Sequence, residues 1–130
     1  MNNRERDFLN SKNLCRVATA SRDATPFVSP VTYILSKDDD HIIIATDYGT
    51  KKLKNLKENP KVSLVVDDYQ PNRGVIIHGD CTVLEKGPDY LRLLKLLFAG
   101  VKYYGENPWK EGEAPILDIT PRRVISWGLG

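Results

Sequence analysis

Hydroxyl and lysine side chains gather at one short turn of this sequence, within residues 46–60, which are TDYGTKKLKNLKENP. An apolar run ends just before this turn, and Gly49 lies inside it. Leu53 and Leu56 then follow at helical spacing until Pro60 ends the pattern. The first turn of a helix offers unpaired N–H groups and the positive end of the helix dipole, which together suit a phosphate group. Four side chains would surround this seat: Thr46, Thr50, Lys51 and Lys52.

Length and composition are those of an ordinary globular protein. At 130 residues, with 41% hydrophobic and 28% charged residues, we expect residues 1–130 to form a single domain. The net charge of +2 is too small for a surface that coats nucleic acid, and no apolar run is long enough to span a membrane. The first ten residues are polar and charged, so we expect no secretory signal and a cytoplasmic protein.

The cysteines and histidines do not have the spacing of a metal-ligand set. Cys15 and Cys81 lie in apolar segments, which favours buried free thiols over a disulfide. His41 opens an apolar run and His78 interrupts another, so we expect structural roles for both and no metal site. No serine has a histidine and an acid at a spacing that indicates a hydrolase triad, and no acid–base residue stands out in the sequence.

Apolar and alternating runs predict a mainly β fold with helices at its periphery. Strands are expected over residues 14–20, 27–35, 41–45, 61–66, 74–85, 116–119 and 124–127, with a turn at residues 120–121. Helices are expected over residues 3–12 and 50–58 and from Pro88 onward, and the last helix carries Leu91, Leu94, Leu97 and Phe98 on one face. Residues 100–114 are expected to form a loop. Pro30 indicates an edge strand or a bulge, and Gly79 indicates a bend or a bulge. A closed or partly closed antiparallel barrel accounts for this order most simply.

Four segments in this order resemble those of a known family: RVATAS (16–21), PFVSPVTYI (26–34), IIIATDYGTKKLKNLKENPKVSLVV (42–66) and LDITPRRVISW (117–127). The chain resembles the pyridoxamine 5'-phosphate oxidase-like, FMN-binding split-barrel family. This resemblance implies a six-stranded antiparallel split β-barrel. It also implies a homodimer that holds two FMN molecules in clefts between its subunits. The oxidase that names the family carries a further segment after the position of Trp127, so we expect a short, general member here.

The resemblance implies a role for each matching position. Arg16 would reach the FMN phosphate from the first strand, and Lys51 and Lys52 would meet it from the turn, with Thr46 and Thr50 beside them. Residues of two strands would line the ribityl chain and the ring: Val17, Ala18, Thr19, Val31, Thr32 and Tyr33. Arg73 and Gly74 would approach the flavin from the other subunit. Without the resemblance, the same turn is also typical of an ordinary capped helix with solvated lysines.

The leading hypothesis is an FMN-binding oxidoreductase that acts on a small-molecule substrate or electron donor, which the sequence does not identify. One alternative keeps the fold and binds the deazaflavin F420, because LKNLKENPKVSL also resembles F420-binding relatives and Lys54 and Lys57 would widen the basic groove for an acidic tail. The other alternative is a flavin- or haem-binding module without turnover, in which His41 or His78 would be the haem ligand.

Overall fold

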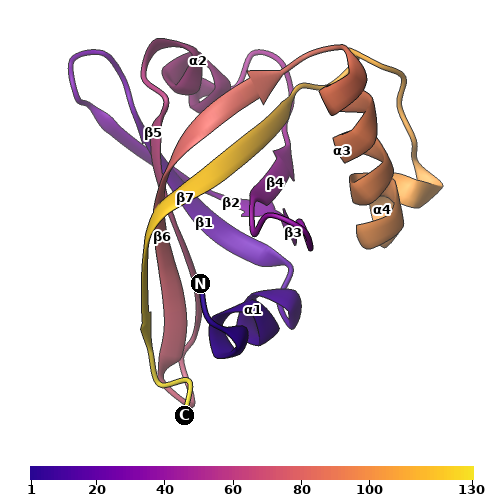
Figure 1. Cartoon of the computed structure of the whole chain (residues 1–130). Helices are drawn as coiled ribbons and strands as arrows, with labels where there is room; N and C mark the ends of the chain where they lie inside the picture. Colours follow the sequence, from indigo (N-terminus) through magenta and orange to yellow (C-terminus); the bar gives the residue numbers. More distant parts are fainter.

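The computed structural model describes residues 1–130 and shows one curled antiparallel sheet with four helices around it (Figure 1). The strands are β1 (Leu14–Ala20), β2 (Pro26–Thr32), β3 (Ile34–Leu35), β4 (Ile42–Ala45), β5 (Lys61–Asp68), β6 (Arg73–Leu84) and β7 (Ile116–Trp127). The helices are α1 (Asn3–Asn10), α2 (Lys51–Glu58), α3 (Pro88–Gly100) and α4 (Lys102–Glu106). The strands follow the order β2-β1-β5-β6-β7-β4-β3 and form a half-barrel. The mainly β, antiparallel architecture is therefore confirmed, with seven strands instead of the six that the family resemblance implies.

The expected strand over residues 27–35 divides at Tyr33 into β2 and β3, which pair with different neighbours. Strand β2 pairs with β1, whereas β3 pairs with β4 on the other side of the half-barrel. Tyr33 is buried at this break, and its hydroxyl donates a hydrogen bond to the carbonyl of Leu9 at 2.6 Å. Strand β2 forms one edge of the sheet, as Pro30 predicts.

Strands β6 and β7 form the longest ribbon of the sheet, and a β-bulge lies near its middle (Figure 1). The register shifts between His78 and Gly79: Gly79 pairs with Pro121 and His78 with Arg123, so Arg122 is the extra residue. The bulge at Gly79 confirms the prediction. The expected turn at residues 120–121 is wrong, because the bulge accommodates Pro121 inside a continuous strand.

The main core fills the inside of the half-barrel. Inward-facing strand residues such as Val17 and Ile77 pack there with side chains of α1 and with Leu53 and Leu56 of α2. Cys15 and Cys81 belong to this core as buried free thiols, as predicted. Burial raises the pKa of each thiol to about 12.

Helix α3 forms a second, smaller core against β4 and β7. Tyr90, Leu93, Leu94 and Leu97 are its buried residues. Leu91, which was expected on the same face as Leu94 and Leu97, is 45% exposed, because the buried stripe is shifted by one residue toward Tyr90. The expected loop over residues 100–114 contains the short helix α4. None of the four helices is both long enough and apolar enough to span a membrane.

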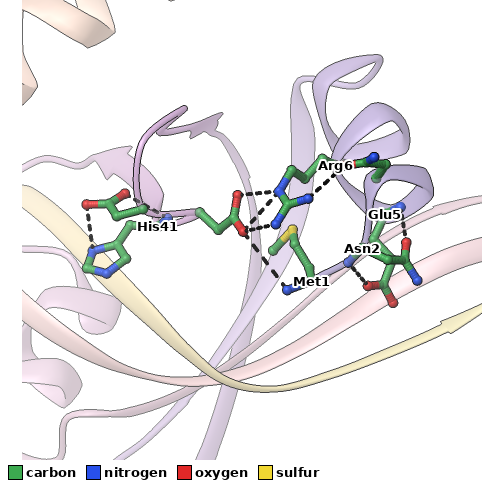
Figure 2. A network of polar contacts seen from close by, with 8 residues as sticks. Met1, Asn2, Glu5, Arg6 and His41 are labelled. Carbon is green, nitrogen blue, oxygen red and sulfur yellow. Dashed lines mark hydrogen bonds and ion pairs between the residues drawn. The ribbon is translucent and has the colours of Figure 1, made fainter.

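Polar contacts hold helix α1 on the sheet (Figure 2). Asn2 caps the helix: its Oδ1 accepts from the Glu5 N–H at 2.9 Å, while its own N–H donates to Glu5 Oε1 at 2.8 Å. Arg6 donates to both carboxylate oxygens of Asp40: Nε lies 2.8 Å from Oδ1 and 3.1 Å from Oδ2, and Nη2 lies 2.9 Å from Oδ2. The terminal ammonium of Met1 lies 4.0 Å from the same carboxylate. These contacts join α1 to the turn between β3 and β4.

The bulge gives a test of the fold. A Cβ atom at Gly79 would lie 2.5 Å from the carbonyl oxygen of Thr120 and 3.1 Å from Cγ2 of Ile119. Gly79→Ala should therefore lower the free energy of unfolding by about 1–3 kcal/mol, because backbone must move to make room. Thr82→Ala, at an exposed position of the same strand, should change it by less than about 0.5 kcal/mol. Urea unfolding measures both; equal stability of the two variants would contradict the tight pairing at the bulge.

Candidate functional site

Helix α2 begins at the turn after strand β4, and two threonines build its first turn. Gly49 adopts φ of +85°, a conformation that glycine takes without strain, and so lets the chain turn into the helix. Thr50 is the N-cap: its Oγ1 accepts from the Leu53 N–H at 3.3 Å and donates to the carbonyl of Asp47 at 3.1 Å. The buried Thr46 places its Oγ1 3.5 Å from that of Thr50. The remaining N–H groups of this turn have no partner within the helix and carry the positive end of its dipole.

Lys51 and Lys52 are neighbours in sequence but have opposite environments. Lys51 is exposed, whereas Lys52 is only 8% exposed. The Lys52 amine takes part in none of the ion pairs or side-chain hydrogen bonds of the structure. Burial lowers its pKa, and the nearby Asp47 and Cys15 oppose that shift. Burying a lysine side chain without an ion-pair partner costs free energy, and a bound anion would offset that cost.

Asn55 is a further polar residue of this helix face, and the sequence interpretation missed it. It is fully buried, and its Nδ2 donates to Oγ1 of Thr19 at 3.1 Å. Its Oδ1 is buried without a hydrogen-bond partner. Asn55 lies three residues after Lys52, between Leu53 and Leu56 on the apolar side of the helix. A polar residue inside that apolar stripe was the signal that could have identified it.

The three predicted site residues of β1 that follow Arg16 divide between the two faces of the strand, as alternation requires. Val17 and Thr19 point into the half-barrel and are buried, and Thr19 contacts α2 through Asn55. Ala18 lies on the outer face. Arg16 also lies there: its side chain is 56% exposed and its Nη1 is 3.5 Å from Oδ1 of Asp67. Within one chain, the structure thus brings Thr19 to α2 and directs Arg16 to the opposite face of the sheet.

The predicted residues of the second strand have less access to a ligand. Val31 and Thr32 are half-buried at the end of β2. Tyr33 is only 2% exposed and belongs to the main core, with its hydroxyl bound to the carbonyl of Leu9. Burial raises the pKa of Tyr33, so the phenol stays neutral. The structure therefore places Tyr33 among core side chains and away from any open ligand surface.

Arg73 and Gly74 lie at the start of β6, at the end of the half-barrel opposite α2 (Figure 1). Nε of Arg73 donates to Oδ2 of Asp68 at 2.7 Å, and its guanidinium lies over the ring of Phe8, 5.3 Å from the centroid. Gly74 is buried, and a Cβ there would lie 2.7 Å from the ring of Trp127. A ligand at the start of α2 could meet these residues only from a second copy of the chain.

No group of three or more His, Cys, Asp or Glu side chains is arranged to hold a metal ion. Of the predicted residues, Thr46 and Thr50 lie together at the start of α2, followed by the exposed Lys51 and the buried Lys52, while Thr19 contacts the same helix only through Asn55. This arrangement offers backbone N–H groups, hydroxyls and one buried cation, which together suit an anion such as a phosphate.

The buried Lys52 predicts a pH-dependent stability difference. The pKa of Lys52 is lowered from 10.5 in the folded chain. At pH values below the folded pKa the amine is charged in both states, and its burial lowers the free energy of unfolding. This destabilisation decreases as the pH rises from the folded pKa toward 10.5. The free energy of unfolding of the wild type should therefore rise relative to that of Lys52→Met between neutral pH and pH of about 10. The exposed Lys51→Met should show a flat difference in the same chemical-denaturation series. A flat difference for Lys52→Met would contradict its burial as a charged group.

Comparison with known proteins gives a family match over nearly the whole chain. The family described as pyridoxamine 5'-phosphate oxidase matches residues 1–128. A 5a,11a-dehydrotetracycline/5a,11a-dehydrooxytetracycline reductase from Streptomyces rimosus is 26% identical over 133 aligned positions, covering 97% of this chain and 82% of the reductase.

Solved structures share the fold. A conserved hypothetical protein from Mycobacterium tuberculosis has a TM-score of 0.79 and 24% identity, covering 99% of this chain and 86% of that protein. An F420 reductase has a TM-score of 0.71 and 20% identity, covering 96% of this chain and 98% of the reductase. The match of residues 1–128, supported by this common fold, shows that the chain belongs to the pyridoxamine 5'-phosphate oxidase family.

Proposed function

We propose that this protein is a cytoplasmic FMN-binding oxidoreductase that works as a homodimer, with the flavin held between subunits. The observation that carries the proposal is the start of α2, where the buried Lys52 side chain has no ion-pair partner beside the N-cap Thr50. The FMN phosphate would bind there, with Thr46 and Lys51 completing its surroundings. When bound, the flavin ring supplies hydride or electron transfer. The protein would orient the flavin and exclude water from it.

The outer face of the sheet supports the homodimer. Apolar side chains from five strands lie on this face, exposed or half-exposed: Leu14, Val28, Val65, Ile76 and Ile125. Val28, the most exposed of them, is 65% exposed. Exposed apolar side chains gathered on one sheet face are typical of a protein interface. Its covering by a second copy would also bring Arg16, and the partner's side chains, close to a ligand bound between the subunits.

The phosphate seat can be tested by flavin titration. The double variant Lys51→Ala/Lys52→Ala should bind FMN at least tenfold more weakly than the wild type, because it loses two cations that would contact the phosphate. Lys54→Ala, on the exposed side of the same helix, is the matched control and should change the affinity by less than about threefold. Quenching of flavin fluorescence on binding gives the dissociation constants.

Riboflavin, which has no phosphate, distinguishes a loss of phosphate contacts from a general loss of flavin binding. The double variant and the wild type should bind riboflavin within about threefold of each other, since the lysines would contact only the phosphate. An equal loss of FMN and riboflavin binding would show that the lysines do not act through the phosphate. Wild-type protein that binds no FMN would contradict the proposal altogether.

The homodimer gives a second test. Ile125→Glu places a charge on the outer face and should shift the protein from dimer to monomer in analytical ultracentrifugation, because a buried carboxylate without a partner is costly. The FMN affinity should fall together with the dimer, since the flavin would lose one wall of its site. Lys86→Glu, at an exposed position outside this face, should leave both unchanged. A monomeric wild type that binds FMN would refute the shared site.

F420 is the second candidate cofactor, and the lysines of α2 favour it. Lys51 and Lys54 are exposed, and Lys57 of the same helix pairs with Glu85 at 3.3 Å. This row would suit an acidic tail. The absorbance of the bound cofactor distinguishes the two, since FMN peaks near roughly 450 nm and F420 near roughly 420 nm.

The haem alternative depends on two histidines. His41 (Figure 2) has its Nδ1 2.7 Å from Oδ1 of Asp118, the kind of contact that orients a metal-ligating histidine. His78 has its Nδ1 2.6 Å from Oγ of Ser63 and lines a cleft of about 450 Å³. Neither histidine lies at the start of α2, so haem would need a site separate from the phosphate seat.

A further inference from the structure

A cavity lies between the turn that precedes α2 and helix α4. It has a volume of about 340 Å³, at the lower end of the range for small-molecule sites. Its walls include Thr46 and Asp47 from the turn after β4. The opposite wall is formed by Tyr103, Tyr104, Asn107 and Trp109. The proposed flavin site does not use this aromatic wall.

The aromatic wall is held in place by edge-to-face contacts and hydrogen bonds. The rings of Tyr104 and Trp109 are nearly perpendicular, with an interplanar angle of 84° and centroids 5.1 Å apart. Trp109 also packs edge-on against Phe98 at 4.9 Å, and its Nε1 donates to the hydroxyl of Tyr90 at 3.0 Å. The Tyr90 hydroxyl donates in turn to the carbonyl of Ala114 at 2.6 Å. These contacts fix the rings beside the cavity, and fixed rings need little reorganisation to receive a ligand.

Asp47 gives this cavity its only formal charge among the lining residues. Its carboxylate takes part in none of the ion pairs of the structure, and no side-chain hydrogen bond engages it. The charge of Asp47 affects two neighbouring groups. Burial is the main cause that raises the pKa of Tyr104, and Asp47 adds to that rise. Burial lowers the pKa of Lys52, and Asp47 opposes that lowering. A carboxylate that forms no ion pair within 4.0 Å and lines the same cavity as aromatic rings attracts a positive charge.

We propose that this cavity binds a small organic cation, with the ammonium group between the carboxylate of Asp47 and the rings of Tyr103, Tyr104 and Trp109. Anions are disfavoured, because the one charge of the lining is negative. Asn107 adds an acceptor, since its Nδ2 already donates to the carbonyl of Tyr103 at 3.0 Å and leaves its Oδ1 free. The cation would sit beside the phosphate seat, on the other side of Thr46. This site does not require that the chain bind FMN.

Choline and its neutral isostere 3,3-dimethyl-1-butanol test the proposal directly, because they differ in charge and hardly in shape. Isothermal titration of the full chain, without flavin, should show at least tenfold tighter binding of choline. Asp47→Asn should reduce that preference to about threefold or less, while Asp38→Asn, at an exposed position of the β3–β4 turn, should retain it. Tyr103→Ala removes an exposed ring and should weaken choline binding about two- to fivefold.

Three results would overturn the cation site. They are equal affinity for choline and the isostere, an unchanged preference in Asp47→Asn, and no saturable binding of choline by the wild type. Quenching of Trp109 fluorescence in Trp127→Phe, which leaves a single tryptophan, should follow the same binding curve. Saturable choline binding without a change in Trp109 emission would place the cation elsewhere and would also overturn the proposal. Since no measurement involves flavin, a failure of FMN binding leaves these outcomes unaffected.

Discussion

The apolar register of helix α2 is the constraint on which the candidate site depends. Leu53 and Leu56 must face the main core, because they cover one end of the half-barrel. Lys52 lies four residues before Leu56 and therefore on the same helix face, so packing of the leucines draws its side chain inward. The N-cap Thr50 fixes where the helix starts, and with it the position of the buried amine. Helix packing thus places a cation without an ion-pair partner next to unpaired backbone N–H groups.

The sheet contributes a second constraint, since a strand has only two faces. The inner face of β1 and its neighbours is filled by the main core, as the buried Val17, Tyr33 and Ile77 show. Little room is left there for a ligand as large as a flavin. The outer face instead carries exposed apolar side chains. The proposed flavin would therefore lie at the rim of the half-barrel, reaching from the start of α2 onto the outer face, where the proposed second copy would enclose it.

Local signals in the sequence predicted much of this arrangement. Thr50 and Pro60 bracket α2 because capping and helix termination depend on nearby residues alone. Pro30 predicted an edge strand and Gly79 a bulge for similar reasons. The break at Tyr33 and the continuity of β7 through Pro121 were not predictable, because each depends on which strand lies alongside. The turn expected at Pro121 is correct as a local preference, and pairing with β6 overrides it.

The candidate site was predictable to the same extent. The turn from Thr46 to Lys52 is contiguous, so sequence alone predicts that its side chains lie close together, although not which of the two lysines is buried. Arg16 pairs with Asp67, which is 51 residues away, and the pair forms only because β1 and β5 are adjacent. The aromatic wall beside Asp47 likewise joins α4 to the turn after β4. Contacts of this kind join segments that are distant in sequence, so they can be predicted only when the fold is known.

A crystal structure of the full chain grown with saturating FMN would test the central claim most directly. The account predicts the FMN phosphate within hydrogen-bond distance of Thr50 and the Lys52 amine, at the start of α2. It also predicts that the flavin ring lies between two copies of the chain. A phosphate bound away from α2, or crystals without flavin at saturating FMN, would contradict the account.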